Sequence, residues 1–100
     1  MPERRKQRRI PVRIDSFCKS ASKSMMGHVS NLSAGGCRVM CALPLAEGEE
    51  IVLTLYAGQD GPMTLKGRVV STSANGFGIK FEKMNPSVQF QMGEVLASLR

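Results

Sequence analysis

Apolar and polar residues alternate along four stretches of this chain. The first stretch runs from Ile10 to Ile14, and the others cover residues 51–56, 63–69 and 77–82. Because successive side chains of a β-strand point to opposite faces, each stretch predicts a strand with one buried and one exposed face. Two weaker stretches, 25–31 and 36–41, bring the expected number of strands to about six.

Turn-forming residues separate these stretches. The Asn-Gly pair at 75–76 is the strongest hairpin signal, because both residues tolerate the positive φ angles of a tight primed turn. Segments 47–48 and 60–62 predict two more turns. Gly67, on the inward face of its strand, indicates a bend or a close backbone approach. This spacing is typical of an all-β sandwich or barrel.

The end of the chain changes to a helical period. Asn85 followed by Pro86 predicts a helix start, because Asn caps exposed backbone donors and proline suits the first turn. The apolar residues beyond it fall on one stripe of such a helix: Val88, Met92, Val95, Leu96 and Leu99. We expect a helix over residues 85–100 that packs this stripe on a barrel formed by residues 10–84.

Charge is concentrated at the N-terminus. The 100 residues suit one domain, and their formal net charge is +6. Six cations and one anion lie within residues 1–13, so this segment accounts for +5 of the total. We expect residues 1–9 to form a flexible basic arm, since their charges repel and they bury little. An anionic partner should be attracted to this end of the chain.

The remaining composition favours a cytoplasmic protein without a metal. No stretch approaches the ~18 apolar residues of a membrane helix, and the N-terminus lacks the apolar run of a secretory signal. Cys18, Cys37 and Cys41 are too few for a disulfide scaffold, and a zinc site would need about four ligands, so buried structural thiols are favoured. Methionines are expected to fill gaps in the core: Met25, Met26, Met40, Met63, Met84 and Met92.

The chain offers little for catalysis. Its single histidine, His28, is interpreted as an ordinary strand residue rather than a general base or a metal ligand. The eight acidic residues are scattered, and no pair has the spacing of acid/base partners. We therefore expect a protein that is not an enzyme and has no catalytic residue and no cofactor.

A nucleic-acid-binding barrel is one alternative, because a basic arm on a small barrel can hold phosphates. Barrels that stack bases need several exposed aromatic rings. This chain has four Phe and one Tyr, and Phe77 and Phe81 share a face with Ile79, which indicates core. The remaining rings make a poor stacking surface, so nucleic acid is the weaker hypothesis.

Two motifs suggest a binding site. Arg5-x-x-x-Arg9 precedes the first predicted strand, and Asn31-x-Ser33-x-x-Gly36 lies between the second and third. Asn and Ser both donate and accept hydrogen bonds, and Gly allows close approach to the main chain. Alone, the second motif is better interpreted as an ordinary turn between two strands. Together, in this order, the motifs resemble the PilZ domain, and "RRIPV", "VSNLSAGGCRV" and "NGFGIKF" extend the resemblance over most of the chain.

The resemblance implies a six-stranded antiparallel β-barrel that acts as a bacterial receptor for cyclic di-GMP (c-di-GMP). It implies that Arg5 and Arg9 grip the phosphates and guanine edges of the ligand. Asn31, Ser33 and Gly36 would form the barrel-surface part of the site, where they meet a guanine. Three residues are possible additional contacts: Arg8, Arg13 and Gly35.

Arg4 bears on the number of ligand molecules bound per chain. In the PilZ family, an arginine just before the first motif accompanies binding of an intercalated ligand dimer, so the resemblance implies two c-di-GMP molecules per chain. Arg4 and Arg8 also satisfy the spacing, but Arg5 and Arg9 are preferred because Arg9 directly precedes Ile10.

The expected mechanism is a clamp in which the arm folds over bound ligand and changes the surface that an unidentified effector protein contacts. Control of motility or biofilm formation is what the family suggests. A further alternative is a PilZ-like adaptor that binds protein and has lost its ligand.

Overall fold

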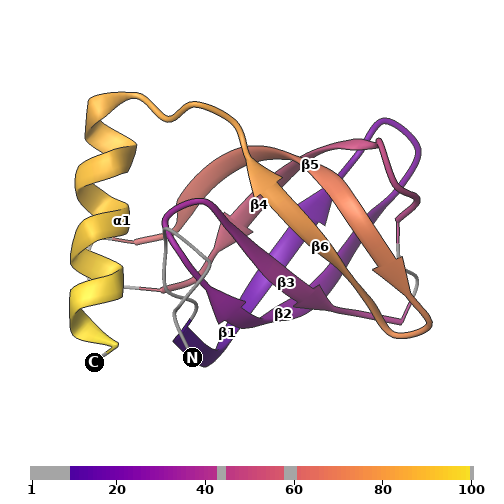
Figure 1. Cartoon of the computed structure of the whole chain (residues 1–100), viewed down its shortest axis with the longest axis horizontal. Helices are drawn as coiled ribbons and strands as arrows, with labels where there is room; N and C mark the ends of the chain where they lie inside the picture. The colour runs from indigo at the N-terminus through magenta and orange to yellow at the C-terminus, as the bar shows by residue number, and fades with distance from the viewer. Residues whose placement is uncertain (1–9, 43–44, 58–60, 100) are drawn as a thin grey trace, which may run out of the picture.

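A computed structural model describes residues 10–42, 45–57 and 61–99 of the chain. Within them, six strands close into an antiparallel barrel in the order β1-β2-β3-β6-β5-β4, and one helix follows (Figure 1). The predicted all-β barrel with a C-terminal helix is confirmed. The strands are β1 (Ile10–Lys19), β2 (Ser24–Leu32), β3 (Gly36–Met40), β4 (Glu50–Leu55), β5 (Met63–Ser73) and β6 (Gly76–Phe81).

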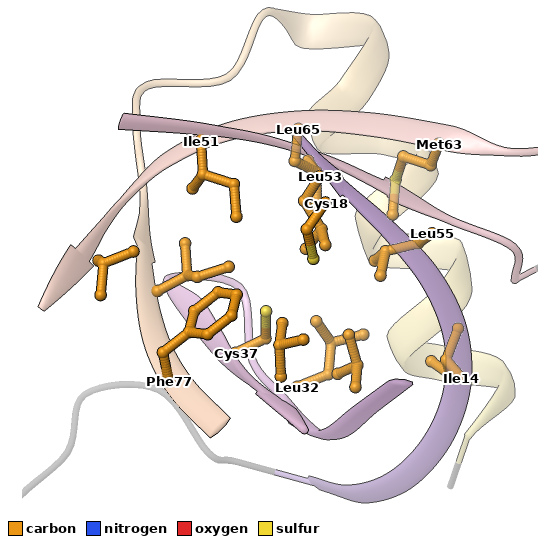
Figure 2. Close-up of a cluster of buried hydrophobic side chains, with 14 of the residues drawn as sticks. Ile14, Cys18, Leu32, Cys37, Ile51, Leu53, Leu55, Met63, Leu65 and Phe77 are labelled. Atoms are coloured by element: carbon orange, nitrogen blue, oxygen red, sulfur yellow. The ribbon is translucent and has the colours of Figure 1, made fainter. Parts of the chain in front are cut away.

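The core fills the inside of the barrel, where the alternating apolar residues of every strand converge (Figure 2). Cys18 of β1, Leu53 of β4 and Leu65 of β5 are aligned across neighbouring strands, and each is at most 3% exposed. Phe77 of β6 is fully buried opposite Val39 of β3. The period-two pattern therefore marks the inward face correctly over most of each strand.

Helix α1 (Pro86–Ser98) stands against one end of the barrel (Figure 1). The side-chain oxygen of Asn85 accepts a 2.9 Å hydrogen bond from the Val88 N–H, which caps the first turn as the sequence predicts. Met92 and Val95 are buried against the barrel, and Leu96 is half-buried beside them. None of the described helices is long and apolar enough to cross a membrane.

The β5–β6 hairpin occurs where the Asn-Gly pair predicted it, but the predicted primed turn is wrong. Ser73 pairs directly with Gly76, so the two turn residues are Ala74 and Asn75, and neither has a positive φ angle. Gly76 belongs to β6 instead, where a Cβ atom would collide with the carbonyl oxygen of Val39. The glycine is needed for close strand approach rather than for turn geometry.

The predicted turn at 47–48 is confirmed, since Gly48 has a φ angle of +91°. Gly61 has a φ angle of +93°, but the turn predicted at 60–62 begins at Asp60, which lies outside the described residues. The close approach expected at Gly67 is also confirmed, because a Cβ atom there would lie 2.5 Å from Cγ2 of Ile79. Residues Gly48 and Gly61 use the conformational freedom of glycine, whereas Gly67 uses its lack of a side chain.

The prediction for the methionines holds only in part. Met63 and Met92 are 2% exposed and fill the core, whereas Met26 is 61% exposed on the outer face of β2. Met26 faces outward because its pairing partner, Phe17 of β1, alternates with the buried Ser16 and Cys18.

Candidate functional site

Asn31 lies near the end of β2, between Pro11 of β1 and Arg38 of β3. The following residue, Leu32, is fully buried, so Asn31 is on the outer face of the barrel. The Asn31 side-chain oxygen is shielded from solvent and accepts no hydrogen bond from any described residue. Buried polar atoms normally have a partner, so this oxygen is an acceptor that the described residues leave unsatisfied.

A bulge in β2 turns Asn31 outward. Val29 pairs with Val39 and both are buried, so strict alternation would place Asn31 inside the barrel as well. The β2–β3 register shifts between Val29 and Asn31, and Ser30 has no partner of its own in β3. This extra residue brings Asn31 opposite Arg38 on the outer face.

Ser33 occupies the turn between β2 and β3 and is 5% exposed. Its hydroxyl donates to the carbonyl oxygen of Gly36 (3.2 Å) and accepts from the N–H groups of Gly35 (3.3 Å) and Gly36 (3.2 Å). The Ser33 N–H also donates to the Gly36 carbonyl at 2.9 Å. One donor and two acceptor positions are all that a hydroxyl offers, so this side chain fixes the shape of the turn.

Two glycines fasten this turn to the neighbouring strand β6. A Cβ atom on Gly36 would collide with the carbonyl oxygen of Ile79, so only glycine allows β3 and β6 to approach this closely. The carbonyl oxygen of Gly35 accepts a 2.9 Å hydrogen bond from the Phe81 N–H. Ala34, between Ser33 and Gly35, lines a pocket of about 380 Å³ together with Met92 and other residues of α1 and β6.

The start of β1 lies beside this motif. Ile10 pairs with Leu32 and Pro11 pairs with Asn31. The β1–β2 register then shifts before Ile14, and the exposed Arg13 falls in this bulged segment. Bulges are common next to functional sites, where they redirect side chains.

The structure thus gathers four of the predicted site residues at one end of the β2–β3 hairpin, with Arg13 on the adjoining strand. These four are Asn31, Ser33, Gly35 and Gly36. The predicted arginines of the arm lie outside the described residues: Arg4, Arg5, Arg8 and Arg9.

Sequence reasoning missed Arg38, the outward neighbour of Asn31. Arg38 is half-buried, and its guanidinium donates to the Ser73 hydroxyl of β5. The signal was available, since Arg38 is a cation between the apolar residues Cys37 and Val39 of an otherwise apolar strand.

The Cys18 thiol is not poised for chemistry. Cys18 and Cys37 are in the core, as predicted, and Cys41 is half-buried. Burial raises the pKa of Cys18 to about 12 together with a smaller effect of the Cys41 thiol, and the Ser16 hydroxyl opposes them only weakly. In the described part of the chain, no cluster of three or more His, Cys, Asp or Glu residues could hold a metal ion.

Comparison with known proteins identifies relatives of the fold. A family model of the PilZ domain matches residues 3–97. The PilZ domain of YcgR from Escherichia coli, solved with c-di-GMP, superposes with a TM-score of 0.82 at 22% identity, over 97% of this chain and 92% of that domain. The PilZ domain of CeSA from a cellulose-synthesizing bacterium gives 0.78 at 19% identity, over 93% and 99% of the two chains.

Longer proteins also contain this fold. The inhibitor of motility MotI from Bacillus subtilis superposes with a TM-score of 0.78 at 16% identity, over 97% of this chain but only 51% of MotI. This chain thus spans about half of MotI and nearly the whole of the YcgR and CeSA domains. None of the curated proteins matches the chain by sequence.

Proposed function

This chain belongs to the PilZ domain family, and we propose that it is a receptor for c-di-GMP. One observation carries the proposal. Ile10 pairs with Leu32, so the residue that directly follows the arginine motif lies beside Asn31 and the turn that it begins. The residue that follows the first motif and the start of the second motif, more than twenty residues apart in sequence, therefore adjoin the same corner of the barrel.

The arginines supply the chemistry for an anionic guanine ligand. A guanidinium group presents paired N–H donors that fit either two phosphate oxygens or the O6 and N7 atoms of guanine. In this proposal Arg5 and Arg9 make such contacts, while the excess charge of the segment attracts a ligand with two phosphates. Lysine could supply the charge but not the paired donors.

The β2–β3 turn supplies the complementary surface. The Asn31 side-chain oxygen, which accepts no hydrogen bond from the described residues, suits the N1–H and N2–H donors of a guanine base. Ser33 contributes through the turn that it holds, because its hydroxyl is already engaged by Gly35 and Gly36. Gly35 bears no side chain, so a base can approach the main chain there, whereas the buried Gly36 contributes by letting β3 and β6 approach closely. Arg8 and Arg13 remain candidates for additional contacts.

Solved relatives support the ligand assignment. Besides the isolated domain, YcgR from E. coli was solved in complex with c-di-GMP at 26% identity and a TM-score of 0.79, with 97% of this chain and 46% of YcgR covered. We extend the proposal to two ligand molecules per chain, with Arg4 contacting the second. The arm folds over the ligand, and the ordered arm presents a new surface to an effector protein.

Isothermal titration with c-di-GMP tests the proposal. We expect binding with two ligands per chain, and we expect Arg5→Ala and Arg9→Ala each to weaken it by roughly 1.5–3 kcal/mol, the scale of a charge-assisted hydrogen bond. Arg68→Ala is the matched control, because Arg68 is a surface arginine of β5 that pairs with Glu50 at 3.3 Å.

The titration has clear contrary results. No binding at tens of micromolar (roughly −6 kcal/mol) would reject the receptor. Binding of one ligand per chain, unchanged by Arg4→Ala, would reject the two-ligand extension. Equal losses in the Arg5, Arg9 and Arg68 variants would reject a fitted site in favour of general charge attraction, as expected for a nucleic-acid-binding barrel.

A further inference from the structure

The outer face of the barrel carries a continuous row of residues that starts at Asn31. Arg38 of β3 pairs with Asn31, Gly78 of β6 pairs with Arg38, and Ser71 of β5 pairs with Gly78. Because paired residues point to the same side of a sheet, this row (Asn31, Arg38, Gly78 and Ser71) is a shared surface across four strands.

Bulges shape both ends of this row. The β2 bulge turns Asn31 outward at one end. At the other end the β5–β6 register shifts between the buried Val69 and Ser71, so Ser71 also faces outward where strict alternation would bury it. Two independent irregularities therefore place polar side chains on the same outer row.

Arg38 is held in the middle of the row. Its guanidinium donates to the hydroxyl of Ser73, which itself donates to the carbonyl oxygen of Gly76 at 3.3 Å. Gly78 is on β6, between the strands that carry Arg38 and Ser73. It has no side chain to obstruct the Arg38 side chain where that side chain reaches across β6. The tether restricts the rotamers of a long side chain, which lowers the entropy cost of ligand contact.

Most N–H donors of the Arg38 guanidinium are not engaged by the described residues. Arginine has five N–H donors, and the described residues provide Arg38 with the Ser73 hydroxyl alone as a side-chain acceptor and with no carboxylate. Arg68, on the same barrel, is paired with Glu50. Because the described residues give the half-buried Arg38 no anionic partner, its guanidinium can still donate to a pair of acceptor atoms on a ligand.

We propose that Arg38 is a further ligand-binding residue, whose guanidinium donates to the O6 and N7 atoms of the guanine that Asn31 contacts. This inference rests on the proposed c-di-GMP site. Neighbouring strands are about 4.8 Å apart, so a base that meets the Asn31 amide brings its other edge within reach of the adjacent Arg38. The paired donors of arginine match O6 and N7, which distinguish guanine from adenine.

Titrations of four variants with c-di-GMP test the assignment. We expect Arg38→Ala to weaken binding roughly 10- to 100-fold. Arg38→Lys should weaken it comparably, because an ammonium keeps the charge but cannot donate in parallel to two acceptors. Ser73→Ala should cost about two- to fivefold, since it removes only the tether. Arg68→Ala, which removes the same charge from another part of the barrel, should stay within about twofold.

The outcomes separate the role of Arg38 from the receptor function itself. If the wild-type chain binds c-di-GMP and Arg38→Ala binds within about twofold of it, the inference is wrong while the receptor stands. Full affinity in Arg38→Lys would reject the contact to O6 and N7. Failure of the wild-type chain to bind rejects the receptor itself. Thermal unfolding of each variant checks the fold, and if Arg38→Ala does not fold, an unchanged affinity in both Arg38→Lys and Ser73→Ala rejects the inference.

Discussion

The two sides of the barrel are built differently. Around β4, the pairings with β1 and β5 run without any register shift, over four and six consecutive residue pairs. Around β2, β3 and the end of β5, three pairings each shift once. Both sides contribute buried side chains to the core, such as Leu53 of β4 and Val39 of β3. On the irregular side, bulges turn Asn31 and Ser71 outward. The strict alternation of inward and outward side chains is therefore interrupted where the candidate site lies.

The outer surfaces differ accordingly. On the regular side, the outward residues are exposed apolar or charged side chains such as Val52 and Lys66, which pair across β4 and β5. On the irregular side, the outward residues include Asn31 and Arg38, which are half-buried and offer unused hydrogen-bonding capacity. A binding surface needs such groups held in place, and the bulges with the Ser33 turn hold them.

The largest expected effect is on the regular side. Leu53→Ala should lower the free energy of unfolding by about 2–5 kcal/mol, because Leu53 is 1% exposed and its removal leaves a cavity. Urea unfolding measures the loss. The c-di-GMP affinity of the folded variant should stay within about twofold of wild type. A parallel loss of affinity would contradict the separation of the two sides.

Gly36→Ala should affect both properties. The added methyl group meets the Ile79 carbonyl oxygen, so we expect a loss of about 1–3 kcal/mol in unfolding free energy and weaker c-di-GMP binding through the displaced turn. Gly93→Ala is the matched control, because a Cβ atom at this helix position has open space. That control should be neutral or stabilising by up to about 1 kcal/mol. Equal stability of the two variants would refute the close approach at Gly36.

The Cys18 thiol should make the core sensitive to high pH. Its pKa is raised from 9.0 to about 12 in the folded chain. The unfolded chain therefore releases this proton first, so its contribution to stability is complete below pH 9 and is lost as the pH rises from 9 to about 12. The slope for one group is at most about 1.4 kcal/mol per pH unit.

Chemical denaturation across this pH range measures the effect. Lysine and tyrosine also titrate there, so Cys18→Ala serves as the reference, and the difference in slope between the two proteins reports Cys18. Identical slopes would show that the thiol is not shielded as the structure indicates.

The smallest effect is expected at Met26. This side chain is 61% exposed on the outer face of β2, so Met26→Ser should change the unfolding free energy by no more than about 0.5 kcal/mol and leave c-di-GMP affinity unchanged. Denaturant titration checks the first expectation and calorimetry the second. A loss above 2 kcal/mol would indicate that Met26 has a packing role, as the sequence suggested.

The fold was accessible from the sequence because burial follows period two in most of each strand. Val39, Leu53 and Ile79 all point inward where the alternation places them. Asn85 and Pro86 likewise marked the helix start, since capping is a local interaction. Such features depend on residues near one another in the chain.

The bulges were not accessible, because one extra residue leaves no compositional trace. Val29 and Leu32 are both fully buried three residues apart, which no regular strand allows. Without the shift at Ser30, Asn31 would pair with Cys37 and face the core. The motif therefore identified Asn31 but not its pairing with Arg38.

An amide NMR titration tests the account most directly, because it reports on both sides of the barrel in one experiment. On addition of c-di-GMP, we predict that the backbone amide signals of Asn31, Gly35, Arg38 and Gly78 shift, while those of Val52 and Thr54 in β4 stay in place. Shifts centred on β4, or no shift at saturating ligand, would contradict a c-di-GMP site on the irregular side.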